Sequence, residues 1–405
     1  MSVLSQRIQN VKPSPTLMIT AKAKALQAQG KDVIGLGSGE PDFDTPEHIK
    51  KAAIRALREG FTKYTAVEGI SELHQAIIQR YAKDHNMTLT PDQIVVTVGG
   101  KQAFYNLIQA TINPGDEVII PAPYWVSYPD MVLLADGVPV TVATKEENGF
   151  KMTPEELEAA ITAKSRFLVI NSPSNPTGSA YTAEELIALG AVLERHPHVW
   201  VITDDIYEKI IYKPFKFVTI TGVVPALQNR TVILSGVSKA YSMTGWRIGY
   251  AVGPKEIIKA MVKMQSQSTS NATSIAQRAA AVALAGPQKC IKPMLKAFLE
   301  RRDFVVNALN AMPGITCRTP EGAFYVFPNV AGLMGTTAPN GTRINDTLEF
   351  SAYLLEAVGV AVVPGSAFGL DPYFRISFAT SMQDLEQAMI RIRKVAEELT
   401  QHKAG

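Results

Sequence analysis

The sequence predicts an α/β protein with a larger domain built on a mostly parallel, doubly wound sheet, and a smaller α+β domain. Strand-like and helix-like segments alternate from about residue 46 onward. The strand-like segments are mostly continuous runs of β-branched residues, which suits strands covered on both faces. After Pro287 the pattern changes to long helices separated by short strand-like runs, which predicts the second domain.

The elements of the larger domain follow in order. A helix opens at Pro46, and a second helix runs from Ile70 to about Lys83. The first strand, "QIVVTV", leads into the helical segment "GGKQAFYNLIQAT". Further strands are expected at "DEVIIP" (116–121), "RFLVIN" (166–171), "VWVIT" (199–203), "TVILS" (231–235) and "RIGYAV" (247–252).

The elements of the smaller domain are more widely spaced. The expected order is a long charged helix over roughly 291–312, the strand "AFYVF" (323–327), a helix near 346–357, the strands "VAVVP" (360–364) and "FRISF" (374–378), and a final helix from about 381. Between these elements, the Gly-, Thr- and Asn-rich segment "AGLMGTTAPNGTRIND" is typical of an exposed loop.

Composition limits the kinds of partner. The 405 residues include 40 Lys or Arg and 37 Asp or Glu, with no long run of like charge, which argues against a nucleic-acid-binding surface. Cys290 and Cys317 are too few for a disulfide framework or a thiolate metal site, so we expect free thiols and no metal. The N-terminal stretch lacks the apolar region of a signal peptide, and no segment approaches about 18 uninterrupted apolar residues. We therefore expect a soluble cytoplasmic protein that binds small molecules and no membrane.

Two glycine-rich stretches were compared with nucleotide-binding motifs. In "LGSGEPDF" the third glycine, Gly39, comes one residue early for a dinucleotide fingerprint, and Glu40 and a proline prevent immediate entry into a helix. A tight turn near a ligand is the better interpretation. In "VGGKQAF" two glycines stand between a strand and a helix, so the free N–H groups bind an anion such as phosphate, or the glycines only permit the turn. The P-loop pattern is absent from the sequence.

Further polar residues follow strand-like runs at their carboxyl ends. "NSPSNPTG" holds Asn175 in a rigid loop, and "TDDIYEK" offers Asp204 and Tyr207. Lys239 follows "TVILSG" and stands eight positions before Arg247. Taken singly, each has a simpler explanation as a structural turn, a helix cap or a solvated lysine. Because such residues converge at one edge of a parallel sheet, we expect them to form a common site.

The motifs resemble a known family over nearly the whole chain. "GEPDFDTP", "KYTAVEGI", "GGKQA", "PAPYWVSYPD", "NSPSNPTG", "DDIYE", "SKAYSMTGWRIGY", "EGAFYVF", "VAVVPGSAFG" and "FRISFATS" occur in the order of the class I, fold-type I aminotransferases that use pyridoxal 5′-phosphate. The resemblance is strongest to the bacterial gamma branch, which contains aspartate and aspartate/prephenate aminotransferases. It implies a homodimer with shared active sites. It also implies a large cofactor-binding domain of residues 46–290 and a small domain made of an N-terminal arm, 1–45, and residues 291–405.

The resemblance implies catalytic roles for Lys239, Asp204 and Tyr207. Lys239 resembles the lysine that forms the internal aldimine with the cofactor and then moves the proton between Cα and C4′. Burial and neighbouring cations would lower its pKa from about 10.4 toward the working range. Asp204 matches the carboxylate that keeps the pyridine nitrogen protonated, while Tyr207 and Asn175 match the donors to the 3′-oxygen. Asp205, where relatives usually have glutamate, is expected to act from behind the site or to be structural.

Other residues match cofactor and substrate contacts of the family. Trp125 matches the ring stacked on the cofactor, and position 236, a phosphate-binding serine in some relatives, is glycine here. The remaining implied cofactor contacts are Gly99, Gly100, Lys101, Ser238 and Arg247, with Tyr64 from the other subunit. The implied substrate contacts are Gly39 and Arg375 for the α-carboxylate, Trp125 and Asn175 beside it, and Lys101, Thr16 and Lys12 for the distal carboxylate or for prephenate.

The reaction implied by the resemblance is transamination of L-aspartate with 2-oxoglutarate to oxaloacetate and L-glutamate, with conversion of prephenate to arogenate as a further reaction. Alternatives are an aminotransferase for aromatic or other amino acids, a β-lyase on the same fold, and a non-enzymatic transcription regulator. The set of Arg375, Trp125 and Lys101 favours transamination. A regulator would carry an N-terminal DNA-binding domain, for which "GEPDF", beginning at Gly39, leaves no room.

Overall fold

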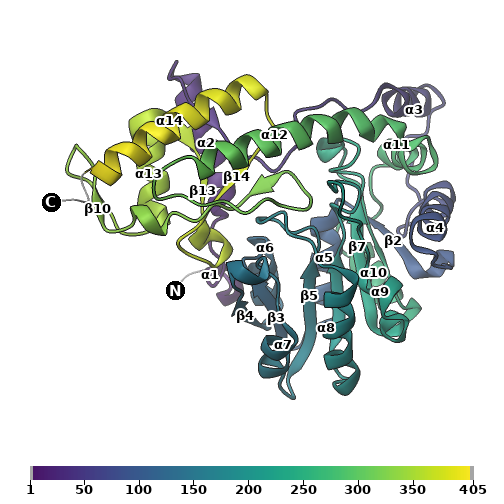
Figure 1. Ribbon diagram of the computed structural model, residues 1–405. Coiled ribbons are helices and arrows are strands. Elements are labelled where there is room, and N and C mark those ends of the chain that lie inside the picture. The colour runs from purple at the N-terminus through teal and green to yellow at the C-terminus, as the bar shows by residue number, and fades with distance from the viewer. Residues whose placement is uncertain (1–2, 402–405) are drawn as a thin grey trace.

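A seven-stranded sheet lies at the centre of the computed structural model, which describes residues 3–401 (Figure 1). The strand order is β2-β8-β7-β6-β5-β3-β4, and all neighbouring strands are parallel except where β8 pairs with β2 and β7. The predicted fold class, with a mostly parallel sheet, is therefore confirmed. The strands are β2 Ile94–Thr97, β3 Glu117–Ala122, β4 Val138–Ala143, β5 Ser165–Asn171, β6 Trp200–Asp204, β7 Thr231–Gly236 and β8 Gly249–Val252.

Helices cover both faces of this sheet. Successive side chains of a strand point to opposite faces. In β5, Val169 accordingly packs with residues of α5, α6 and α10, whereas Leu168 and Ile170 pack with residues of α7 and α8. This double cover explains why the central strands are continuous apolar runs. The helices are α3 Glu47–Arg58, α4 Ser71–His85, α5 Gly100–Thr111, α6 Ser127–Leu133, α7 Pro154–Ala160, α8 Ala183–Arg195, α9 Ile220–Val223, α10 Lys255–Ser266 and α11 Ser274–Ala285.

The second part of the molecule is built from both ends of the chain (Figure 1). β1 (Ile34–Gly35) pairs in parallel with β12 (Val360–Ala361), and a three-stranded antiparallel sheet has the order β13-β14-β9. This pairing supports our proposed division into residues 46–290 and a domain of 1–45 with 291–405. The elements are α1 Gln6–Gln9, α2 Pro15–Ala28, α12 Lys292–Asn310, β9 Tyr325–Val326, α13 Thr347–Val358, β13 Val363–Pro364, β14 Phe374–Ser377 and α14 Met382–Gln401.

The prediction of an exposed loop over residues 331–346 is wrong in part. β10 (Thr336–Thr337) and β11 (Arg343–Ile344) form a short antiparallel hairpin in this segment. Leu333 and Ile344 are fully buried and pack into the main hydrophobic core. Most residues of the segment are small or polar, so these two buried apolar residues could not be recognised from its composition.

Other strand predictions also differ from the structure. The predicted strand 247–252 begins only at Gly249, because Arg247 has the left-handed backbone angle φ 56°. The predicted strand 360–364 is divided into β12 and β13, which pair with different partners. β4 was not predicted, because this half-exposed edge strand contains Pro139 and lacks a continuous apolar run.

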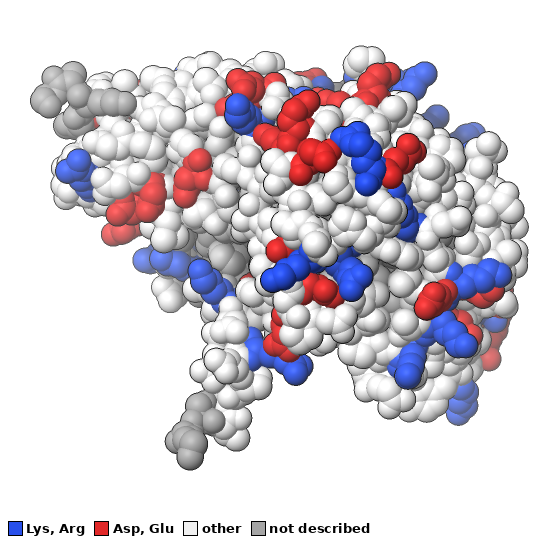
Figure 2. Space-filling view, turned by 90° about the horizontal axis from the view of Figure 1, so that it is seen from below, with Lys and Arg blue, Asp and Glu red and all other residues white. Residues whose placement is uncertain are grey.

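The surface carries mixed charge. On the face seen in Figure 2, basic and acidic side chains are interspersed and no broad area of one sign is visible. Cys290 and Cys317 are both free, as predicted. None of the helices in residues 3–401 combines the length and the apolar character needed to cross a membrane.

Candidate active site

A cavity of about 370 Å³ opens at the carboxyl ends of the parallel strands and is lined by residues from both parts of the molecule. This volume suits a small organic ligand. The fold therefore brings together most of the side chains that the sequence placed in one site. The predicted residues that line the cavity are Thr16, Gly39, Gly100, Lys101, Trp125, Asn175, Asp204, Tyr207, Ser238, Lys239, Arg247 and Arg375.

The start of α5 forms one wall of the cavity and is shaped by glycines. Gly99 has φ 80°, and a Cβ atom there would lie 2.3 Å from Nη2 of Arg247. A Cβ atom on Gly249 would lie 2.3 Å from the amide nitrogen of Gly100. The first N–H groups of a helix have no partner within the helix and attract anions. Together with the adjacent guanidinium of Arg247, they make a cationic corner that fits a phosphate group.

Lys239 lies three residues after β7, and its half-buried side chain lines the cavity. Its Nζ donates a hydrogen bond to the carbonyl oxygen of Gly39 at 2.6 Å. Burial, followed by the charges of Arg375 and Arg247, lowers the pKa of Lys239 to about 8. A sizeable fraction of this amine is therefore neutral near neutral pH, as a nucleophile or base requires.

Asp204, the last residue of β6, lines the same cavity and lies near enough to Lys239 for their charges to interact. Its Oδ2 accepts a hydrogen bond from the hydroxyl of Tyr128 at 2.6 Å, and its Oδ1 accepts one from the amide of Ile206 at 3.3 Å. Burial raises the pKa of Asp204. Asp205 does not line the cavity and instead accepts a hydrogen bond from Thr203, as expected for a structural residue.

Arg375 projects from β14 and is only 2% exposed. Its Nη1 donates to Oδ1 of Asn175 at 2.8 Å, its Nη2 donates to the carbonyl of Gly37 at 2.6 Å, and its guanidinium lies 4.6 Å from the centre of the Tyr325 ring. Within residues 3–401 its Nε has no hydrogen-bond partner. A buried, unpaired donor on a cation is costly, so this site fits an anionic ligand group.

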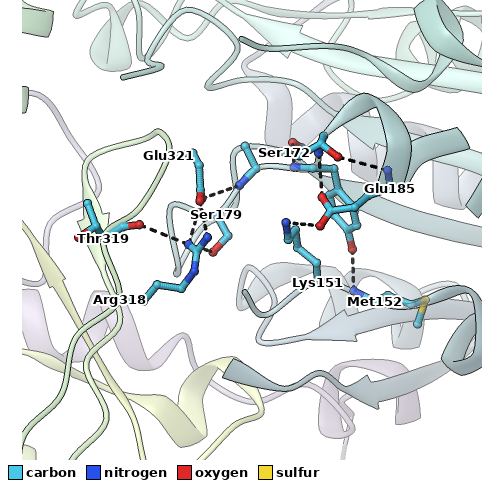
Figure 3. A network of polar contacts seen from close by, with 11 residues as sticks. Lys151, Met152, Ser172, Ser179, Glu185, Arg318, Thr319 and Glu321 are labelled. Atoms are coloured by element: carbon cyan, nitrogen blue, oxygen red, sulfur yellow. Dashed lines mark hydrogen bonds and ion pairs between the residues drawn. The ribbon is translucent and has the colours of Figure 1, made fainter. Parts of the chain in front are cut away.

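A polar network outside the cavity holds the loop that carries Asn175 (Figure 3). Glu321 pairs with Arg318, which also donates to Ser179, and Glu321 accepts the amide N–H of Ala180. On the other side of the loop, the amide of Tyr181 donates to Oγ of Ser172, and the hydroxyl of Tyr181 accepts the amide N–H of Met152. These contacts join the segment around Asn175 to both parts of the molecule.

Lys101 and Thr16 line the cavity on the side of Trp125. Nζ of Lys101 lies 5.0 Å from the centre of the Trp125 ring, and burial, with the charge of Arg247, lowers the pKa of this lysine. The hydroxyl of Thr16 is buried and has no partner in the described part of the chain. A second cation and a free hydroxyl thus face the same cavity as Lys239.

Three of the predicted contacts do not line the cavity in this chain. Lys12 lies exposed in the segment before α2, where its backbone contacts Asp130. Tyr64 is 91% exposed, and its expected contact with a neighbouring subunit stays a prediction. Gly99 supports the cavity from behind Gly100.

The sequence reasoning assigned no role to two tyrosines of the site. Tyr128 stands three residues after Trp125, which lies in the turn that leads into α6, and the amide of Tyr128 donates to the carbonyl oxygen of Trp125, so this spacing could have indicated it. Tyr325 shares a hydrogen bond with Tyr207, with 2.8 Å between their hydroxyl oxygens. This contact depends on the position of β9 beside β14, which no local pattern reveals.

The family model described as aminotransferase class I and II matches residues 31–392. The chain belongs to this family. It is similar to the aspartate/prephenate aminotransferases from Cereibacter sphaeroides, with 57% identity over 97% of this chain and 98% of the relative, and from Nitrosomonas europaea, with 56% identity over 96% and 98%. A crystal structure of the aspartate aminotransferase from Rhizobium meliloti matches it with a TM-score of 0.95 and 52% identity over 98% of this chain and 100% of that chain. The aspartate aminotransferase from Thermus thermophilus with maleate matches with a TM-score of 0.90 and 44% identity over the same shares.

At position 236, where the resemblance implied a phosphate-binding serine in some relatives, this aminotransferase has glycine. A Cβ atom on Gly236 would lie 2.9 Å from Cα of Gly249 and 2.9 Å from the carbonyl oxygen of Ile248. Contacts that short require a shift of the backbone. The close approach of β8 to β7 therefore explains the glycine, and Arg247 and Ser238 remain as the side chains available to an anion in this corner.

Proposed function

We propose that this aminotransferase binds pyridoxal 5′-phosphate in the cavity. The residues fit the group in three places. The start of α5 with Arg247 and Ser238 suits the phosphate, the buried carboxyl of Asp204 suits the pyridine nitrogen, and the low-pKa amine of Lys239 suits the aldehyde. The other proposed cofactor contacts are Gly99, Gly100, Lys101, Trp125, Asn175 and Tyr207, with Tyr64 from a second subunit.

When bound, the cofactor supplies an aldehyde for the substrate amine and an electron-poor ring that weakens the Cα–H bond. The protein's own residues supply the rest. Nζ of Lys239 takes the proton from the substrate Cα, because its lowered pKa leaves it partly neutral, and would deliver that proton to the carbon of the cofactor's aldehyde group. Arg375, held by Asn175 and the carbonyl of Gly37, binds the α-carboxylate and so orients the Cα–H bond toward Lys239.

The substrates that this site supports best are aspartate and 2-oxoglutarate, with oxaloacetate and glutamate as products. The observation that carries this proposal is the presence of two cations, Arg375 and Lys101, in the same cavity as Lys239. Each of these substrates has two carboxylates, so each can form an ion pair with both cations. The names of similar proteins, which are aspartate aminotransferases, support aspartate as one of the substrates.

Prephenate is a second proposed amino-group acceptor, and it would be converted to arogenate. Lys101 is a flexible point charge beside Trp125, and such a cation tolerates larger side chains better than a rigid arginine would. Relatives at 57% and 56% identity are named aspartate/prephenate aminotransferases. Steady-state kcat/KM values for aspartate, glutamate and prephenate test both proposals, and values for all three no higher than that for alanine would contradict them.

Replacing Lys101 by alanine is expected to lower kcat/KM for aspartate, glutamate and prephenate by about 10- to 100-fold, equivalent to about 1.4–2.7 kcal/mol. The cation that meets the distal carboxylate is removed, whereas the backbone at the start of α5 still meets the cofactor phosphate. Alanine, which has no distal carboxylate, should be almost unaffected. Equal losses for alanine and aspartate would show that Lys101 is structural.

The proposed assembly is a homodimer in which Tyr64 enters the neighbour's active site. Tyr64 is 91% exposed and is therefore accessible to a neighbouring subunit. Tyr64→Phe is expected to raise the dissociation constant for pyridoxal 5′-phosphate by about 10-fold, through loss of one hydrogen bond to a charged group. Equilibrium dialysis measures this constant. Sedimentation should give twice the chain mass of 44.0 kDa for wild type and variant, and a monomer mass would contradict the proposal.

A further inference from the structure

Charged side chains of alternating sign connect α4 to the turn that follows β6. Three of them belong to the last turns of α4, and two belong to the segment "DDIYEK", which also contains Asp204 and Tyr207. The charges alternate from the helix to the turn and back. In spatial order they are Arg80, Asp84, Lys209, Glu208 and His85.

The contacts along this series are short. Nε of Arg80 lies 3.1 Å from Oδ2 of Asp84, and the same oxygen accepts a hydrogen bond from Lys209. Nζ of Lys209 lies 3.5 Å from Oε1 of Glu208, and Nε2 of His85 lies 2.7 Å from Oε2 of Glu208. Each acidic side chain therefore lies between two basic side chains.

The innermost pair is buried on the far side of the turn from the active site. The side chains of His85 and Glu208 are 7% and 8% exposed, so separating them would leave an uncompensated buried charge. Asp204 and Tyr207 line the cavity, whereas Glu208 does not. The turn thus has one face toward the cavity and one face held by α4. A positive charge on His85, the last residue of α4, also meets the negative end of the helix dipole.

We propose that His85 and Glu208 are positioning residues, whose ion pair fixes the turn that presents Asp204 and Tyr207 to the cofactor. The inference rests on the proposed function, because it concerns side chains assigned to cofactor binding. The pair itself has no contact with the cavity. Its effect on cofactor binding is therefore transmitted through the backbone of four residues, from Asp204 to Tyr207.

The charge state of the pair makes this effect pH-dependent. Burial alone would lower the pKa of His85, but the hydrogen bond and the charge of Glu208, with Asp205, outweigh it and raise this pKa above 6.5. Burial would raise the pKa of Glu208, but Lys209 and His85 outweigh it and lower this pKa. The groups that face the pair from all neighbouring elements are Asp205, Lys209, Tyr81, Tyr241 and Tyr250, with the ring of Phe217 beside His85.

The sign of the pH dependence follows from these shifts. Because the pKa of His85 is raised in the folded protein, protonated His85 stabilises the fold. This contribution is complete below the ordinary histidine pKa and is lost as pH rises through the pKa that His85 has in the folded protein. Because the pKa of Glu208 is lowered in the folded protein, ionised Glu208 also stabilises the fold. This contribution is lost only as pH falls through the pKa that Glu208 has in the folded protein. The ion pair therefore holds the turn best at mildly acidic pH and weakens toward alkaline pH.

The experiment compares cofactor-free wild type with His85→Gln, which keeps a hydrogen-bond donor but has no charge. Fluorescence titration gives the dissociation constant for pyridoxal 5′-phosphate at about pH 6 and about pH 9, on either side of the ordinary histidine pKa. We expect His85→Gln to raise this constant about 10-fold at the lower pH and less at the higher pH, where a smaller fraction of wild-type His85 carries a proton. Glu208→Gln should also raise it at the lower pH, and it carries the test if His85→Gln does not fold.

His196→Gln is the control, because it removes a second histidine–glutamate ion pair, with side chains 25% and 43% exposed, that contacts neither the turn nor the cavity. It should leave the dissociation constant unchanged at both pH values. The inference would be overturned if His85→Gln had the wild-type dissociation constant at about pH 6, or if it raised this constant equally at both pH values. Failure of wild type to bind the cofactor would contradict the proposed function instead. In that case the melting temperatures of the cofactor-free proteins test the inference. The difference in melting temperature between wild type and His85→Gln must be larger at the lower pH.

Discussion

Replacement of Lys239 by alanine is expected to lower kcat for aspartate by about 10,000-fold or more, equivalent to about 5.5 kcal/mol. This amine is buried in the cavity and has a pKa lowered to about 8, so it is the proposed base for the substrate Cα–H bond. The variant should also lose the covalent bond to the cofactor. Borohydride reduction followed by mass spectrometry of the peptides should then find no cofactor fixed to the protein.

Lys101→Ala is the control for this experiment, because Lys101 is a second lysine in the same cavity. Reduction of that variant should still fix cofactor to Lys239 at wild-type stoichiometry. A reducible cofactor adduct at wild-type stoichiometry in Lys239→Ala would show that the assignment is wrong. Near-ultraviolet circular dichroism of both variants distinguishes a loss of chemistry from a loss of fold.

Replacement of Asp204 by alanine is expected to lower kcat by about 1,000-fold, equivalent to about 4 kcal/mol. The carboxylate holds a proton on the pyridine nitrogen in our proposal, and no other acidic side chain of the described residues lines the cavity. The protein should still fold, because in the structure the Asp204 carboxylate accepts hydrogen bonds only from Tyr128 and from the amide of Ile206. Steady-state kinetics with aspartate and 2-oxoglutarate measures the effect.

Asp205→Asn serves as the comparison for Asp204→Ala. Asp205 is buried beside Thr203, away from the cavity, and burial raises its pKa to about 7. Its replacement should reduce kcat by less than about 10-fold, equivalent to less than about 1.4 kcal/mol. If instead Asp204→Ala stays within about 10-fold of wild type and Asp205→Asn does not, the roles of the two carboxyl groups are reversed.

Much of the site could be predicted from local sequence, because parallel strands deliver their carboxyl ends to one edge. Asp204 ends β6, Lys239 follows β7, and Gly100 begins the helix after β2, so each position is determined by a strand a few residues away. The apolar runs of those strands are easily recognised, since both faces of the sheet are covered.

The contacts that orient these side chains could not be predicted in the same way. The hydrogen bond from Tyr128 to Asp204 spans 76 residues, and the one from Arg375 to Asn175 spans 200. Such contacts arise from tertiary packing, which leaves no periodic pattern in the sequence. The hairpin at 336–344 was missed for the same reason, since only the core around it shows that Leu333 and Ile344 are buried.

The pairing of β1 with β12 has a consequence for biosynthesis. Ile34 leaves the ribosome early but finds its partner, Val360, only when translation is nearly complete. At about 5–20 residues per second, the N-terminal segment waits roughly 20–70 seconds for that partner. Arg375, the proposed carboxylate-binding arginine, is synthesised later still. A truncated nascent chain can therefore form most of the central sheet but cannot assemble the substrate-binding wall, so a ribosome-bound fragment that ends before β12 should be inactive.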